Sequence, residues 1–408
     1  MPTVLEELQR TSDAAEIWWD SSPLDFPGWC DRHLATAPDA STRERWREQL
    51  HRFLCPATPE LSLARGVTTN PSLVAQSVLA SPESWRNDIR QLIRSQASPD
   101  VASTFSLLYE EALRRAAREM LPMWEASEGR YGWVSGQLDP RHMFDTDLML
   151  EQALSIARIA PNLMVKVPGT AQGYAAIRQL VARGISVNST LSYTVPQFVA
   201  CAEAVEAGLL KAKADGVDTG RWRAVFTHMI GRFGANTDLR HEAAIRDIEL
   251  SQTDLRWAEV AILKRIHTLI RENGHPVKPL LSSLEVDDPA LGSATLSMHL
   301  EQSAGGTVAY TCKPRFIADV MLRESELPAF DARAIEEEVP ADVLEKLNWL
   351  PSFQRAYAPD GMRPQEFCHY GSFISTYSEV MGNTRKLIDF VAHQFQAAAL
   401  SARPLQLI

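Results

Sequence analysis

A lysine in the middle of an apolar segment has the placement that most needs a chemical explanation. Lys166 lies within residues 162–170, a short run that ends at Pro168 and Gly169 and is typical of a buried strand. Side chains alternate along a strand, so Lys166 shares with Met164 a face that would line a barrel lumen or a pocket. A buried amine loses hydration, its pKa falls, and a partly neutral amine attacks carbonyl carbons. The position indicates Schiff-base chemistry, with a strand-end lysine that reaches solvent as the alternative.

A second segment, residues 184–191, gathers polar groups on one face in the same way. Ser186, Asn188 and Thr190 occupy alternate positions, and the positions between them are mostly apolar. Two adjacent strands would then each present a polar face, and together they would hold an amine, an amide and hydroxyls. This combination favours an active site over a lysine that merely extends to water.

The two segments resemble the signature of the transaldolase family, in which the lysine forms an imine with the sugar. Residues 66–73, 134–141 and 227–232 fit the same family in the same order. The resemblance spans roughly residues 17 to 315, and the layout looks most like that of the longer bacterial transaldolases. It implies an enzyme of carbohydrate metabolism, as in the pentose phosphate shunt, that transfers a dihydroxyacetone unit or acts as a class I aldolase.

The resemblance also assigns catalytic roles to matching positions. Lys166 would form the imine, and Asp20 would take and return the proton of the C4 hydroxyl. Asn188 and Thr190 would fix hydroxyls and position a water. From the residues alone, Asp20 is more typical of a helix N-cap, because Ser21, Ser22 and Pro23 follow it.

Two residues at the end of the next expected strand are candidates for substrate binding. The family uses Asn70 on substrate hydroxyls, and Thr68 stands two residues before it. Asn70 also precedes Pro71, which can start a helix, so a capping role alone is the alternative.

Gln137 departs from the transaldolase pattern, which has a glutamate here that passes protons through the bound water. A glutamine holds a water but cannot titrate. The fructose-6-phosphate aldolase branch also has glutamine, paired with a tyrosine at the position of Met229, so the change favours simple aldol addition and cleavage. His228 and His142 are candidate replacement bases, although strand alternation turns His228 away from Thr227 and Met229.

The phosphate-binding positions depart from the pattern as well. Arg232 matches the family's phosphate-binding arginine, and Thr227 stands where a serine is usual. A later strand normally ends in Ser-x-Arg or Ser-x-Lys, but here Ser283 is followed by Glu285 and Asp287. Two carboxylates would repel a phosphate dianion, so the expected substrate is unphosphorylated or carries an amine.

Strand-like and helix-like segments alternate along the chain, which predicts a parallel sheet. The strand count is near eight, and the predicted fold is an α/β (β/α)8 TIM barrel with extra N-terminal and C-terminal helices. We expect one unit over residues 1–408, with residues 340–408 as a helical, aromatic extension packed on the barrel; a lid over its mouth is the alternative. The expected helices are residues 1–10, 27–60, 81–124, 145–159, 254–273 and 383–399, with another starting at Thr194.

The composition restricts the class of partner. The chain has 408 residues, 45% of them hydrophobic, and a net charge of -10, which argues against nucleic acid or an anionic membrane surface. Its five cysteines form no Cys-x-x-Cys, and the start of the chain is unlike a signal peptide. We expect a cytoplasmic enzyme without metal or cofactor that acts on a small carbonyl compound. A homodimer is expected only because barrels of this size are often dimers. A lyase that needs no acceptor aldehyde, and a catalytically weak sugar-binding or regulatory barrel, are the alternatives.

Overall fold

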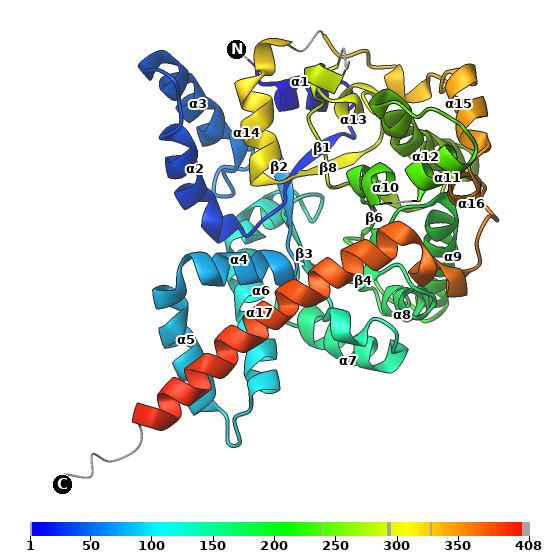
Figure 1. The fold of residues 1–408 in the computed structure, drawn as a ribbon. Coiled ribbons are helices and arrows are strands. Elements are labelled where there is room, and N and C mark those ends of the chain that lie inside the picture. The colour runs from blue at the N-terminus through cyan, green and yellow to red at the C-terminus, as the bar shows by residue number, and fades with distance from the viewer. Residues whose placement is uncertain (1, 237, 292–294, 327–328, 402–408) are drawn as a thin grey trace.

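Eight parallel strands close into a barrel in which each strand pairs with its neighbours in chain order and the last pairs with the first (Figure 1). The computed structural model describes residues 2–236, 238–291, 295–326 and 329–401. The predicted (β/α)8 TIM barrel with additional helices is confirmed. The strands are β1 (Glu16–Trp19), β2 (Ala64–Thr68), β3 (Trp133–Gln137), β4 (Leu163–Pro168), β5 (Val187–Ser192), β6 (Ala224–His228), β7 (Lys278–Leu281) and β8 (Ala309–Cys312).

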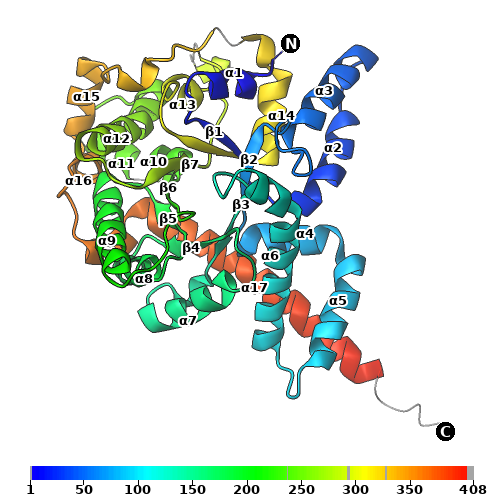
Figure 2. The same cartoon turned by 180° about the vertical axis from the view of Figure 1, so that it is seen from behind.

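Helices surround the barrel, as the two opposite views show (Figures 1 and 2). Their apolar faces form one large core with the outward side chains of the strands. The helices are α1 (Val4–Arg10), α2 (Phe26–Leu34), α3 (Ala40–Phe53), α4 (Pro71–Ala80), α5 (Pro82–Ser95), α6 (Val101–Ala126), α7 (Thr146–Ala157), α8 (Ala171–Val181), α9 (Val195–Ala214), α10 (Ile230–Asn236), α11 (Leu239–Ile245), α12 (Gln252–Asn273), α13 (Met298–Glu301), α14 (Pro314–Leu322), α15 (Ala341–Asn348), α16 (Pro351–Tyr357) and α17 (Gly371–Ser401).

The barrel interior holds a separate apolar cluster near the N-terminal ends of the strands. Trp18, Trp133 and Met164 belong to this cluster, together with inward side chains of β6, β7 and β8. Gly66 makes room for the ring of Trp18, because a Cβ on Gly66 would lie 2.7 Å from two atoms of that ring. Side chains two residues apart on a strand point to the same side, so Lys166 points into the barrel as Met164 does.

An ion cluster lies below this apolar layer. Glu16 is buried, and its carboxylate accepts hydrogen bonds from Arg223, Lys278 and the indole of Trp18, at 2.6, 2.6 and 3.0 Å. These two cations hold the pKa of Glu16 at about 2 although burial alone would raise it. The N-terminal end of the barrel is therefore closed by paired charges.

The C-terminal helix α17 covers the opposite end of the barrel. It packs against α4, α10 and β5, which lie at or follow the C-terminal ends of strands, and then against α5 and α6. Figure 1 shows α17, coloured orange to red, running diagonally across the front of the barrel, and Figure 2 shows it on the far side. The helix is longer than the predicted 383–399, because it begins at Gly371.

Two predicted helices are interrupted. Residues 27–60 form α2 and α3 with a break after Leu34, and residues 81–124 form α5 and α6 with a break after Ser95. Asp39 caps α3 and Asp100 caps α6, each by accepting a hydrogen bond from a backbone amide in the first turn. The sequence therefore carried the signal for both breaks in its capping residues.

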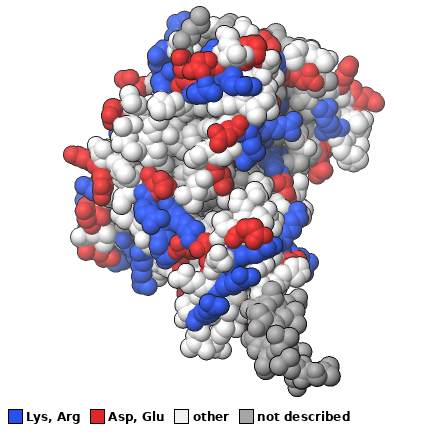
Figure 3. Space-filling model, turned by 90° about the vertical axis from the view of Figure 1, so that its left-hand side faces the viewer, with Lys and Arg blue, Asp and Glu red and all other residues white. Residues whose placement is uncertain are grey.

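The surface mixes charges of both signs. On the face seen in Figure 3, Lys and Arg side chains lie among Asp and Glu side chains, with a broad area between them that carries no charge. Elsewhere in the chain, residues of opposite charge also pair within one helix, as Arg10 does with Glu7. Within the residues that the structure describes, no helix is long and apolar enough to cross a membrane.

Candidate active site

Lys166 lies at the centre of the barrel lumen. Its strand β4 pairs with β3 and β5 so that Lys166 is in register with Gln137 on one side and Asn188 on the other. The residue is 6% exposed, and no side-chain hydrogen bond of Lys166 is found among the described residues. Burial lowers the pKa of the amine, and the nearby carboxylate of Asp20 opposes that shift. The predicted inward, buried amine is thus what the geometry shows.

Asp20 directly follows β1 and faces the same lumen. The hydroxyl of Thr68 donates to Asp20 Oδ1 at 2.6 Å and also lies against the hydroxyl of Thr311. Burial raises the pKa of Asp20, whereas Lys166, the Thr68 hydrogen bond and Lys313 act to lower it. The N-cap interpretation of Asp20 is wrong, because Ser22 caps the short helix η1 (Pro23–Asp25) that follows.

A chain of hydrogen bonds orients the amide of Asn188. Asn188 Nδ2 donates to Ser135 Oγ at 2.8 Å, and the hydroxyl of Thr227 donates to Asn188 Oδ1 at 2.7 Å. The amide keeps one N–H and one oxygen lone pair for another partner. Ser135 and Thr311 belong to this polar layer although sequence reasoning did not single them out. Side-chain alternation along their strands would have indicated that both point into the barrel.

The remaining predicted catalytic residues, Gln137 and Thr190, lie on the strands next to Lys166 and Asn188. Gln137 is buried beside Lys166, and no hydrogen bond of its side chain is found in the part of the chain that the structure describes. Thr190 is buried on β5, in register with Pro168, two residues beyond Asn188 on the same face. An untitratable amide and a hydroxyl thus stand near the amine.

Two predicted substrate-binding residues have structural roles in the geometry. Asn70 caps α4, because its side-chain oxygen accepts from the amide of Leu73 at 2.9 Å; its Nδ2 group and the second oxygen lone pair can still bind another group. Ser283 follows β7 with a φ of 58°, and its carbonyl oxygen would lie 2.1 Å from a Cβ on Gly231. Ser283 therefore shapes a tight turn beside α10.

Arg232 already has a carboxylate partner. Both terminal nitrogens of Arg232 bind the carboxylate of Glu379 on α17, with Nη2 to Oε1 at 3.1 Å. Glu285 pairs with Lys313 at 3.0 Å. Sequence reasoning missed Glu379 and Lys313; the contact between Arg232 and Glu379 joins residues 147 positions apart.

Asp287 is not part of the mouth of the barrel. It is buried, accepts from Arg256 Nε at 2.8 Å, and also accepts from the backbone amide of Met298 at 2.6 Å. The expectation that both Glu285 and Asp287 lie where they would repel a phosphate is therefore wrong for Asp287.

One of the two histidines considered as replacement bases is turned away from the lumen. His228 is fully buried on the outward side of β6, near Glu259 and His299, and burial lowers its pKa to about 3. The His228 ring therefore does not face the amine of Lys166. His142 ends the short helix η2 (Pro140–His142) after β3, and its backbone forms hydrogen bonds with Asp139 and Asp145.

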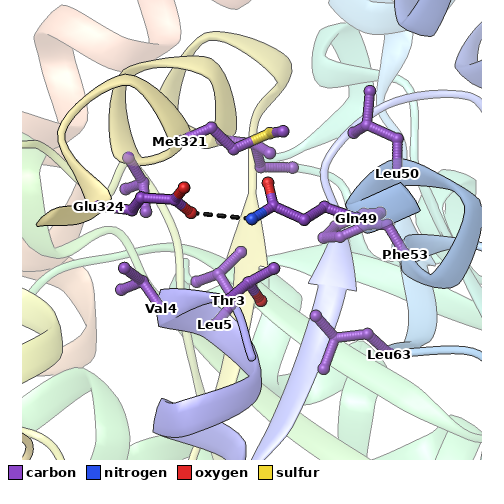
Figure 4. A pocket seen from close by; sticks show the side chains of 11 residues that line it. Thr3, Val4, Leu5, Gln49, Leu50, Phe53, Leu63, Met321 and Glu324 are labelled. Carbon is purple, nitrogen blue, oxygen red and sulfur yellow. Dashed lines mark hydrogen bonds between the residues drawn. The ribbon is translucent and has the colours of Figure 1, made fainter. Parts of the chain in front are cut away.

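A cavity elsewhere in the fold is too small to hold a sugar. It lies between α1, α3 and α14, has a volume of about 20 Å³, and contains a hydrogen bond of 2.9 Å from Gln49 to Glu324 (Figure 4). No group of His, Cys, Asp and Glu side chains that could hold a metal ion occurs among the residues described. The buried amine of Lys166 beside Asp20 is the arrangement with clear chemistry.

Comparisons with known proteins place this chain in a family. A transaldolase of Saccharopolyspora erythraea is 34% identical over 238 residues, which cover 55% of this chain and 63% of that protein. A transaldolase of Mycobacterium leprae is 33% identical over 239 residues, with coverages of 55% and 63%. The alignments thus span less than two thirds of these relatives. The family model described as transaldolase/fructose-6-phosphate aldolase matches residues 52–347, most of the chain, and the chain therefore belongs to that family.

Proposed function

We propose that this protein makes or breaks a carbon–carbon bond of a ketose-like substrate through an imine on Lys166. The observation that carries the proposal is the buried amine of Lys166, without a hydrogen-bond partner among the described residues and facing the carboxylate of Asp20. A buried, unpaired amine lowers stability and is retained where its nucleophilicity is used. The relatives in the comparison are named transaldolases, which supports the same chemistry.

The first steps follow from the positions of the two groups. The neutral amine of Lys166 attacks the ketose carbonyl carbon, and loss of water leaves a protonated imine. The bond between C3 and C4 then breaks, and its electron pair passes into the imine to give an enamine. Asp20 takes the proton of the C4 hydroxyl as that carbon becomes the carbonyl of the departing aldehyde.

The fate of the enamine distinguishes two activities. Attack of the enamine on a second aldehyde, with return of the proton from Asp20, is the transferase reaction of a transaldolase. Protonation of the enamine and hydrolysis of the imine release dihydroxyacetone, which is the lyase reaction. Gln137 favours the lyase as the second candidate, because an amide beside Lys166 cannot carry protons through a bound water.

The remaining assignments follow the same geometry. Asn188, Thr190 and Thr68 would bind substrate hydroxyls or a water, and the free Nδ2 of Asn70 would contribute one hydrogen bond. Thr227 would act indirectly, by holding the Asn188 amide. We propose a substrate without phosphate, because Arg232 is already paired. A cytoplasmic enzyme and a homodimer stay predictions from the sequence.

Borohydride trapping tests the proposal. The intact protein is incubated with dihydroxyacetone, fructose or fructose 6-phosphate, reduced, and analysed by intact and peptide mass. We expect an adduct on Lys166 and none in Lys166→Met. Lys313→Met is the control that keeps the buried amine. Absence of any adduct in a folded protein that still binds sugars would favour the sugar-binding alternative.

A further inference from the structure

The pair of Arg232 and Glu379 joins the C-terminal helix to the mouth of the barrel. Arg232 lies at the start of α10, which follows β6, and its side chain is 29% exposed, against 51% for Glu379. Glu379 raises the pKa of Arg232, and Arg232 lowers the pKa of Glu379, so both groups are charged at neutral pH. The two-point contact uses the guanidinium edge that would otherwise bind an anion.

Glu379 lies on the face of α17 that is turned towards the barrel. Ser372, Thr376 and Glu379 are spaced four and three residues apart, which places them on one side of a helix, and Ser372 and Thr376 are buried. Further along, Leu387 and Val391 are buried where α17 packs on α4, α5 and α6. The polar part of this face is therefore the part that covers the end of the barrel.

Two buried hydroxyls lie beside the ion pair. Tyr193, which directly follows β5, and Thr376 on α17 are both buried. Burial raises the pKa of Tyr193, and the Thr376 hydroxyl opposes that shift, so the two hydroxyls lie close to each other. Arg232 and Glu379 also act on the pKa of Tyr193, so the surroundings of the ion pair are polar but otherwise uncharged on this side.

The charges around the lumen are balanced. The cations Lys166, Lys313 and Arg232 lie near the carboxylates of Asp20, Glu285 and Glu379: Lys166 and Lys313 act to lower the pKa of Asp20, and Glu379 and Glu285 raise that of Arg232. A phosphate dianion on Arg232 would have to displace Glu379 and then lie beside its carboxylate. An uncharged hydroxyl group would leave the pair intact.

We propose that Glu379 determines substrate specificity: it holds Arg232 and excludes phosphate from the distal end of the active site. The distal end of the active site then receives the uncharged end of a sugar. This inference rests on the proposed function and names the residues that set the substrate class. α17 thus contributes to substrate binding as well as covering the barrel.

Binding of inorganic phosphate to the full-length protein tests the exclusion without requiring catalysis. Isothermal titration at low ionic strength should show weak binding to the wild type and at least about ten-fold tighter binding to Glu379→Gln, because the carboxylate charge is gone. Glu366→Gln removes a similarly paired carboxylate on the surface and should leave phosphate binding unchanged. Adding Arg232→Met to Glu379→Gln should abolish the gain.

Trapping on Lys166 provides the second readout. Competition between fructose and fructose 6-phosphate should favour fructose in the wild type and shift at least about ten-fold towards the phosphate ester in Glu379→Gln. Glu379→Ala, checked for folding by circular dichroism, repeats the comparison if the glutamine variant is unstable. Equal phosphate affinity in the wild type and both folded variants would overturn the specificity role. If no adduct forms on Lys166 in any variant but Glu379→Gln still binds phosphate more tightly than the wild type, only the proposed function is refuted.

Discussion

Asp20 and Lys166 face each other across the barrel lumen, and each opposes the pKa shift that burial causes in the other. Burial raises the pKa of Asp20 and lowers that of Lys166, while their mutual attraction acts in the opposite direction on both. Burial therefore brings both groups closer to neutrality, where an amine attacks and a carboxylate exchanges protons. Their mutual attraction favours the charged form of each group, so the protonation of one group depends on that of the other.

Asp20→Asn should move the pH dependence of imine formation to lower pH. Asp20 raises the pKa of Lys166, so its removal lets that pKa fall further below the ordinary lysine value and frees the amine at lower pH. The initial rate of borohydride-trapped adduct formation with dihydroxyacetone, measured from pH 5 to 10, reports the midpoint. Carbon–carbon cleavage should slow by roughly 10²–10⁴-fold, because no carboxylate accepts the proton.

Thr68→Val is the matched control for this variant. It removes the hydrogen bond to Asp20 but keeps the carboxylate, so the midpoint for Lys166 should move less than in Asp20→Asn. An unchanged midpoint in Asp20→Asn would contradict the coupling of the two groups.

Gln137→Glu should shift the midpoint the other way. A carboxylate in register with Lys166 stabilises the ammonium form, so the pKa of the amine rises and imine formation requires higher pH. The same carboxylate can move protons through a bound water, and we expect a larger fraction of transfer product relative to free dihydroxyacetone. Gln137→Met keeps the length without a charge. A transfer-to-release ratio equal in all three proteins would disprove the role of Gln137.

The order of strands and helices along the chain predicted the barrel, and side-chain alternation within the strands predicted the inward lysine. Lys166 and Asn188 show it: the period-two pattern fixes which side chains share a face, and neighbouring strands then bring their polar faces together. The position of Asp20 came from the family resemblance, since the local residues favoured a cap. The cap was Ser22 instead, two residues later.

Contacts between distant segments had no local signal. Glu379 meets Arg232 only because α17 crosses the barrel, and nothing within either segment indicates that packing. Asp287 was misplaced for a related reason: its partner Arg256 lies on α12, and a run of acidic residues does not show which one is paired. The early start of α17 was missed because Gly382 and polar residues weaken helix propensity, which tertiary packing overrides.

Glu16→Gln should destabilise the fold by about 3–5 kcal/mol, because Arg223 and Lys278 would be left buried without their carboxylate. The wild type should also lose stability as the pH falls from about 4.5 towards 2. Glu16 has a folded-state pKa of about 2, below its ordinary 4.5, so its contribution is complete above the unfolded value and disappears as the carboxylate is protonated.

Urea unfolding at pH 7 and at pH 3 measures both effects of Glu16. The control is Glu7→Gln, which removes a carboxylate paired with Arg10 on the surface and should cost less than about 0.5 kcal/mol. Equal stability of the wild type and Glu16→Gln at pH 7 would show that the cluster closing the barrel contributes nothing.

Two glycine substitutions should have opposite effects on stability. Gly66→Ala would place a methyl group 2.7 Å from the buried ring of Trp18, and the strain of moving that ring should cost about 1–3 kcal/mol. Gly382→Ala meets no atom within 4 Å on the exposed side of α17 and should stabilise the protein by roughly 0.5–1 kcal/mol, since alanine loses less backbone entropy in a helix. The denaturation midpoints of the two variants, at equal slopes, measure the difference. A neutral Gly66→Ala would mean that Trp18 moves without strain, so that the layer beneath Lys166 is not tightly packed.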